Sequence, residues 1–178
     1  AQIEGKEAGV EVHQEAGSTR LSDLINKDPM FEICFTHPRL LAAVSRVLQM
    51  DFKVHSLNFR AALPGQGLQA LHADWTPSTE VHREQLKAGY YYVCNSIWLI
   101  DGFTRENGAT RVVPGFHCSG KMPADEMEDP TRPHPDEVRL TAPAGTVVVF
   151  NGHTWHGGTL NASTRSRRGM HSAFIRRD

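Results

Sequence analysis

The chain has 178 residues and a formal net charge of −1, from 19 Lys and Arg residues against 20 Asp and Glu residues. A chain of this length can bury a substantial core, and 39% of its residues are hydrophobic, so we expect one compact domain. The balanced charge removes the bulk electrostatic argument for binding nucleic acid or a membrane surface. No stretch approaches the roughly 18 to 20 apolar residues that a membrane span requires.

The cysteine pattern and the first residues bear on the compartment. Cys34, Cys94 and Cys118 are an odd number without Cys-x-x-Cys spacing, which argues against a disulfide framework and against a zinc site. Residues 1–9 show no basic segment followed by an apolar run, so we predict no secretory signal. We therefore interpret the chain as a cytoplasmic protein with reduced thiols. Ten histidines in so short a chain are a reason to look for a metal.

In chain order, residues 1–52 are predicted to form a helical flank. Thr36 is a candidate cap for a helix with Pro38 in its first turn, a position that proline favours. The apolar residues that follow recur at helical spacing and form one stripe, which is typical of a helix that covers a sheet. They are Leu40, Leu41, Val44, Val47 and Leu48.

Residues 53–178 are predicted to form the β core. Short apolar segments alternate with turns rich in Gly, Pro, Asn and Ser, which favours an antiparallel sandwich or barrel. The predicted strands are residues 53–62, 90–100, 109–113, 137–141, 146–150 and 169–176. Residues 121–135 contain four prolines and several acids, and we predict a surface loop there. The fold class expected is mainly β with N-terminal helices.

Three residues in this core form a candidate metal site. In His72-Ala73-Asp74, positions i and i+2 of a strand would face the same side, so imidazole and carboxylate can converge on one ion. This triplet alone is common by chance. His156 follows a buried strand and a tight turn, and two imidazoles with one carboxylate form the ligand set of non-haem Fe(II) oxygenases.

A candidate anion-binding residue follows the last histidine of that set. Arg167 comes eleven residues after His156, beyond the turn-rich stretch 159–166. If that stretch folds the chain back, Arg167 returns on a strand beside His156. A buried arginine there would suit a dicarboxylate co-substrate, because its guanidinium forms a two-pronged salt bridge.

The combination of motifs resembles the phytanoyl-CoA dioxygenase family. The segment 95–117 contains Asn107-Gly108-Ala109-Thr110 and Pro114-Gly115, with His-Ala-Asp before it and Trp-His-Gly-Gly and an arginine after it. The resemblance covers residues 58–176. It implies a double-stranded β-helix (jelly-roll, cupin-like) fold, Fe(II) as the metal, and 2-oxoglutarate and O2 as co-substrates.

The resemblance also implies a role for individual residues. His72, Asp74 and His156 match the iron ligands and form the catalytic centre, and Arg167 matches the arginine that holds the distal carboxylate of 2-oxoglutarate. Three further residues match positions that contact the co-substrate or line its pocket. They are Gln69, Thr110 and Trp98. His153 lies three residues before His156 and competes for its role, but the family pattern favours His156.

We therefore expect a hydroxylase or a related C–H-oxidising enzyme that acts on a small organic molecule, as in a tailoring step of natural-product biosynthesis. Two other classes stay open. A cupin-like metalloenzyme would use another divalent metal without 2-oxoglutarate and would not require Arg167. A non-catalytic jelly-roll binding module would need none of these residues to converge. The sequence predicts neither the substrate nor the oligomeric state.

Overall fold

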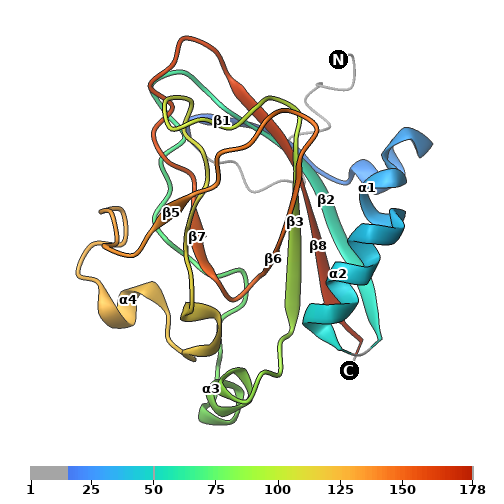
Figure 1. Cartoon of the computed structure of the whole chain (residues 1–178), viewed down its shortest axis with the longest axis vertical. Coiled ribbons are helices and arrows are strands. Elements are labelled where there is room, and N and C mark those ends of the chain that lie inside the picture. The colour runs from blue at the N-terminus through green and yellow to red at the C-terminus, as the bar shows by residue number, and fades with distance from the viewer. Residues whose placement is uncertain (1–15, 50, 178) are drawn as a thin grey trace.

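The computed structural model describes residues 16–49 and 51–177, which form two antiparallel sheets that face each other (Figure 1). The larger sheet has the order β1-β2-β8-β3-β6, with bounds Ser18–Leu21, Phe52–Ala62, Arg167–Arg176, Val93–Leu99 and Val147–Asn151. The smaller sheet has the order β5-β4-β7, with bounds Val138–Arg139, Arg111–Val113 and Trp155–Gly157. This architecture is the jelly roll expected from the sequence.

The register of β2 against β8 decides which side chains face the space between the sheets. The pairing runs from Phe52 opposite Arg176 to Ala62 opposite Arg167. It shifts between Val54 and Ser56, which leaves His55 as an extra residue in a bulge. Beyond the bulge, alternate residues of β2 point inward.

Helix α2 (Pro38–Leu48) covers the outer face of the larger sheet (Figure 1). Its buried residues Leu40, Val44 and Leu48 pack against Cys94 and Phe174 of the sheet. The predicted helix is therefore confirmed, together with its apolar stripe. The cap differs, because the N-cap is the residue after Thr36, a histidine whose Nδ1 accepts a hydrogen bond from the Arg39 amide at 3.2 Å.

The N-terminal flank is not wholly helical. Strand β1 lies within it and pairs with the end of β2, so the flank supplies an edge strand of the larger sheet. Such a strand, only four residues long, carries too little alternation to be recognised in the sequence. Residues 1–15 of the flank lie outside the described part of the chain.

The remaining elements are short. The other α-helices are α1 (Ile33–Thr36), α3 (Glu80–Lys87) and α4 (Pro123–Glu126), and the 3-10 helices span Leu24–Asn26, Pro29–Phe31 and Phe116–Cys118. Helix α3 was not predicted, although Thr79 caps it by accepting a hydrogen bond from the His82 amide. Helix α4 lies in the predicted surface loop. Each predicted strand segment overlaps a strand, whereas β1 was not predicted. The expectation that Arg167 returns on a strand beside His156 is wrong, because β8 pairs with β2 and β3 while β7 pairs with β4 in the other sheet.

Two chemical features complete the fold. Cys34, Cys94 and Cys118 are free thiols, the first two of them buried. Within residues 16–49 and 51–177, no helix is long and apolar enough to cross a membrane.

Candidate metal centre and co-substrate pocket

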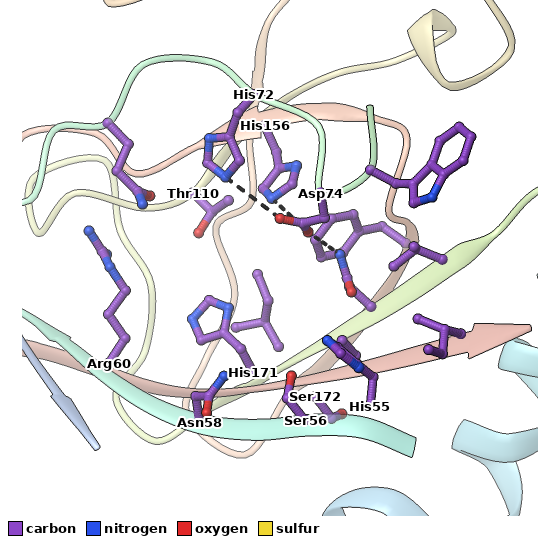
Figure 2. A pocket seen from close by; sticks show the side chains of 18 of the residues that line it. His55, Ser56, Asn58, Arg60, His72, Asp74, Thr110, His156, His171 and Ser172 are labelled. Carbon is purple, nitrogen blue, oxygen red and sulfur yellow. Dashed lines mark hydrogen bonds and ion pairs between the residues drawn. The ribbon is translucent and has the colours of Figure 1, made fainter. Parts of the chain in front are cut away.

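The imidazoles of His72 and His156 and the carboxylate of Asp74 converge on one side of a pocket (Figure 2). Their potential ligand atoms all lie within 4.8 Å of one another. The Nε2 atom of His72 is 3.8 Å from Asp74 Oδ1, and Nε2 of His156 is 3.4 Å from Asp74 Oδ2. These distances suit three groups that share one ion.

Backbone hydrogen bonds, not a continuous strand, place the three residues. His72 and His156 form an isolated bridge in which each amide donates to the other residue's carbonyl at 2.9 Å. The amide of Asp74 donates to the carbonyl of Gly152, also at 2.9 Å. The predicted strand at the His-Ala-Asp triplet is therefore reduced to this bridge beside β7.

The tautomer of both histidines follows from their Nδ1 contacts. His72 Nδ1 lies 2.9 Å from the carbonyl oxygen of Ala70, and His156 Nδ1 lies 2.8 Å from that of Thr154. A carbonyl oxygen only accepts, so each Nδ1 carries the proton and donates it. Each Nε2 then presents a lone pair to the cluster, which is the orientation that a metal-bound histidine needs.

Asp74 is held ionised by its neighbours. Its burial acts to raise the pKa, but the hydrogen bond and charge of His156, with His72 and Asn95, lower the pKa of Asp74 to about 2. Asn95 Nδ2 donates directly to Asp74 Oδ2. Asn95 was missed by the sequence analysis; its position on the inward face of predicted strand 90–100, two residues before Ile97, was the available signal.

A cavity of about 490 Å³ opens beside the cluster and is lined by both sheets. Figure 2 shows the metal-binding candidates on one side and Ser56, Asn58 and His171 of the larger sheet on the other. The predicted co-substrate residues Gln69 and Thr110 both line it.

Gln69 also links two ligand-bearing segments. Its Oε1 accepts a hydrogen bond from the Gly158 amide at 2.8 Å, which joins the residues before His72 to those after His156. A side chain that faces the cavity therefore also fixes its wall.

Arg167 lies at the start of β8 with 2% of its surface exposed. It shares the inward face of β8 with His171 and Ala173, but those two residues line the cavity and Arg167 does not. Its guanidinium lies 4.2 Å above the centre of the Phe103 ring. The neighbouring Arg168 forms a salt bridge with Asp101 at 2.8 Å, and alternation along β8 places the two arginines on opposite faces of the sheet.

The expectation that Trp98 lines the co-substrate pocket is wrong. Asn95 and Ile97 of β3 line the cavity, so alternation turns Trp98 to the opposite face of the sheet. There it lies beside α2, with its ring 6.5 Å from that of His37. Trp98 packs between the helices and the sheet and contributes to the outer core.

His153 is a buried hydrogen-bond acceptor. Its Nε2 accepts from the Tyr92 amide at 3.0 Å, and burial lowers the pKa of His153 to about 4, which keeps the ring neutral. The same Nε2 is thus engaged away from the cluster, and the metal-binding group includes His156 instead.

Arg111 anchors the wall that carries Gln69 and His72. Its side chain is 1% exposed, pairs with Glu137 at 3.2 Å, and donates to the Gln69 carbonyl at 2.8 Å. The same guanidinium donates to three carbonyls of the 121–135 loop, those of Pro130, Thr131 and Arg132. That loop is therefore attached to the site wall.

Comparison with known proteins identifies the family. A family model for phytanoyl-CoA dioxygenase (PhyH) matches residues 4–169. An uncharacterised protein of Mycobacterium tuberculosis is 30% identical over 96% of this chain and 60% of its own length. Dioxygenase trt7 of Aspergillus terreus is 32% identical over 87% of this chain and 53% of its own length. The chain thus spans little more than half of these relatives.

Solved structures agree on the fold. HygX from Streptomyces hygroscopicus, with nickel and 2-oxoglutarate bound, superposes with a TM-score of 0.70 at 16% identity over 91% of this chain and 71% of its own. The epimerase SnoN from nogalamycin biosynthesis gives 0.68 at 15% identity, over 90% and 63%. These identities support the shared architecture, and the family match rests on sequence. The chain belongs to the phytanoyl-CoA dioxygenase family.

Proposed function

We propose that the protein is an Fe(II)- and 2-oxoglutarate-dependent oxygenase that hydroxylates, or otherwise oxidises a C–H bond of, a small organic molecule. The observation that carries the proposal is the convergence of two Nε2 atoms and one carboxylate beside an open cavity. Two histidines and one carboxylate with open positions suit non-haem Fe(II). Family membership supports the same chemistry.

In this proposal His72, Asp74 and His156 hold the iron. When bound, iron and 2-oxoglutarate together supply oxygen activation coupled to oxidative decarboxylation of the co-substrate. The two Nδ1 bonds to backbone carbonyls keep the imidazoles neutral and oriented. Asn95 holds the Asp74 carboxylate through its amide. The ligands are thus oriented before metal arrives.

The co-substrate is proposed to extend from the cluster toward Arg167. A guanidinium keeps its charge when buried and offers parallel N–H donors to a carboxylate. Gln69 and Thr110 line the same cavity and are proposed to contact the co-substrate. A cupin-like enzyme without 2-oxoglutarate would have no use for this arginine.

We propose that the substrate is a natural product or its precursor. We propose neither nucleic acid nor a membrane as a partner of the protein. A structure of HygX contains hygromycin B, and one of SnoN contains nogalamycin RO, so this fold accommodates such molecules in those proteins. The three free cysteines fit a reducing compartment, and we propose a cytoplasmic location.

The test is O2-dependent formation of succinate from 2-oxoglutarate, measured with Fe(II), with Zn(II) or Mn(II), and without metal. We expect succinate only with Fe(II), and its loss in Asp74→Ala. The matched control is Asp136→Ala, a carboxylate whose side chain is 75% exposed, which should retain full turnover. Equal turnover in Asp74→Ala, or none in the Fe(II)-loaded wild type, would reject the proposal.

A further inference from the structure

Trp75 places an indole ring at the cavity that holds the metal-binding candidates. It follows Asp74 directly in the sequence and lines the same cavity as Asp74, His72 and His156. Of the tryptophans and tyrosines in the described part of the chain, it is the only one that lines this cavity. The proposed function gives this side chain no role.

Neighbouring rings hold the indole in that position. The ring of Tyr92 stacks on it, with ring centres 4.1 Å apart and an angle of 12° between the two planes. The rings of His82 and His153 meet it at steep angles, with centres 5.1 and 5.3 Å away. None of these three rings lines the cavity, so they support the indole from other sides. A ring packed in this way has little freedom to turn out of the cavity.

Trp155 provides a contrast within the same site. It precedes His156 as directly as Trp75 follows Asp74, so both tryptophans are sequence neighbours of a metal-binding candidate. Trp155, however, is fully buried and belongs to a hydrophobic cluster. Alternation along β7 turns its ring to the face opposite that of His156. The fold therefore presents one of these two indoles to the cavity and withholds the other.

The metal-binding candidates are open to solvent on the cavity side. The side chains of His72 and Asp74 are 39% and 38% exposed, and the cavity beside them measures about 490 Å³. Oxygenases avoid side reactions by closing the site around the substrate. When no substrate fills this space, the indole of Trp75 is an oxidisable group within the same cavity.

Phe150 is the other residue with a benzene or indole ring that lines the cavity. Its ring centre lies 5.0 Å from that of His156, and the ring packs against the buried cluster that contains Ile97. A benzene ring is less electron-rich than an indole and is harder to oxidise. The chemistry of the two rings therefore favours Trp75 as the target.

We propose that Trp75 is a site of self-hydroxylation, in which the reaction without substrate converts a ring C–H bond of this indole to C–OH. The inference rests on the proposed function, which supplies Fe(II), 2-oxoglutarate and O2. One atom of O2 becomes the hydroxyl group on the ring, and the other enters 2-oxoglutarate, which loses CO2 and leaves as succinate. O2 accepts four electrons in total, two from the ring carbon and two from the decarboxylation. A substrate that fills the cavity would protect the indole.

The experiment maps oxygen addition along the chain. The full chain is incubated with Fe(II), 2-oxoglutarate and O2 without added substrate, and its peptides are then analysed by mass spectrometry. We expect the mass of one oxygen atom on Trp75 and on neither Trp98 nor Trp155. Omission of 2-oxoglutarate, or replacement of Fe(II) by Zn(II), should abolish this addition.

A second measurement tests the placement of the ring without turnover. The chain is labelled with fluorotryptophan and loaded with Co(II), a paramagnetic ion that broadens the fluorine NMR signals of nearby rings, with Zn(II) as the diamagnetic reference. We expect the Trp75 signal to broaden most and the Trp98 signal least. Trp75→Phe keeps a ring for the stack with Tyr92 and identifies the Trp75 signal. Trp98→Phe identifies its own signal and should retain oxygen addition to Trp75.

The outcomes separate this inference from the proposed function. Succinate formation without oxygen on Trp75, or with equal oxygen addition to Trp75 and Trp155, would overturn self-hydroxylation and uphold the enzyme class. Stronger broadening of the Trp98 or Trp155 signal than of the Trp75 signal would overturn the placement of the ring, and the inference with it. An Fe(II)-loaded chain that forms no succinate would reject the proposed function and the reaction proposed for Trp75 together.

Discussion

The two sheets of the jelly roll are built very differently. In the larger sheet, β2 has eleven residues and β8 has ten, and they pair along nearly their whole length. In the smaller sheet β4 and β7 have three residues each, and β5 has two. Yet the metal-binding candidates come from the side of the smaller sheet. The long strand pairs of the larger sheet form one rigid wall of the cavity, and the metal-binding candidates lie on the opposite wall.

Side chains hold the smaller sheet where ladders are absent. Arg111 bonds the Gln69 carbonyl, and Gln69 in turn accepts from the Gly158 amide. Trp155 Nε1 donates to the Lys121 carbonyl at 2.9 Å, from the strand that carries His156. Substitutions in these links should loosen the metal-binding segments more than the rest of the fold. Substitutions beneath the outer face of the larger sheet should lower the stability of the whole fold and leave the metal-binding segments unchanged.

The largest effect is expected at His156, the metal-binding candidate on β7 of the smaller sheet. His156→Ala should reduce Fe(II) affinity by more than about a hundredfold, beyond what loss of an outer-shell partner costs, with the fold retained. Equilibrium dialysis of Fe(II) under nitrogen measures it.

His153→Ala is the matched control for that substitution. It removes the acceptor of the Tyr92 amide, so we expect a loss of about 1–3 kcal/mol in unfolding free energy and an almost unchanged Fe(II) affinity. The opposite pattern, with Fe(II) lost in His153→Ala alone, would show that the two histidines are assigned the wrong way round.

The next effect tests the anchor of the smaller sheet. Arg111→Leu removes one of the two arginines that pair with Glu137, which keeps Arg139 at 3.0 Å, and it removes the guanidinium that donates to the Gln69 carbonyl. Breaking a buried ion pair from one side costs about 3–5 kcal/mol. We expect the lower end of that range, measured by urea unfolding, because Glu137 keeps Arg139 as a partner. Faster amide exchange should be confined to residues 69–72 and 130–132.

The exposed Arg132 provides a comparison for Arg111. Its side chain is 81% exposed in its contact with Asp129, so Arg132→Ala should leave both urea midpoint and amide exchange close to wild type. Uniform loosening of both sheets in Arg111→Leu would show that the smaller sheet does not depend on this anchor.

The larger sheet could be predicted from the sequence because its strands are long and apolar. Segments 53–62 and 169–176 carry enough residues for alternation and turn signals to define them. Strands β1 and β7 have four and three residues, too few to show a period, and β5 has only two of the residues in the predicted segment 137–141. Their positions are set by contacts between distant segments, such as the bridge of His72 and His156.

Only the part of the site that lies in short sequence motifs could be predicted. The three metal-binding candidates occur in short motifs, and the structure brings them together. Asn95 and Arg111 act through partners 21 and 42 positions away, and no local pattern marks them. Trp98 was misplaced because the motif identified the residue but not the face of its strand.

A smaller effect concerns the outer face of the larger sheet. Trp98→Ala removes a half-buried ring that packs beneath α1 and α2. We expect a loss of about 2–4 kcal/mol in unfolding free energy, somewhat below that of a fully buried tryptophan, from urea titration. Affinity for 2-oxoglutarate should stay within about twofold of wild type. A selective loss of co-substrate binding, with stability unchanged, would show that Trp98 lines the co-substrate pocket.

The smallest effect is expected at the surface end of the larger sheet. There, Arg168 donates to both oxygens of Asp101 through its side chain and to one through its backbone amide. These bonds lower the pKa of Asp101, the side-chain bond most. A carboxyl whose pKa is lower in the folded chain stabilises the fold above its unfolded pKa of about 3.9, and this contribution is lost as the pH falls through the folded value.

Arg168→Ala removes the guanidinium but keeps the backbone bond at 2.8 Å and the ladder of β8. Because the pair is solvent-exposed, we expect only a slight decrease in the urea midpoint at pH 7. The difference from wild type should shrink as the pH falls below about 3.9, because folded Asp101 takes up a proton at a higher pH in the variant than in the wild type. Urea titrations at both pH values measure this. A difference that grows in acid would mean that Arg168 stabilises the sheet by something other than its charge on Asp101, and that the long ladder depends on its surface pairs more than its length suggests.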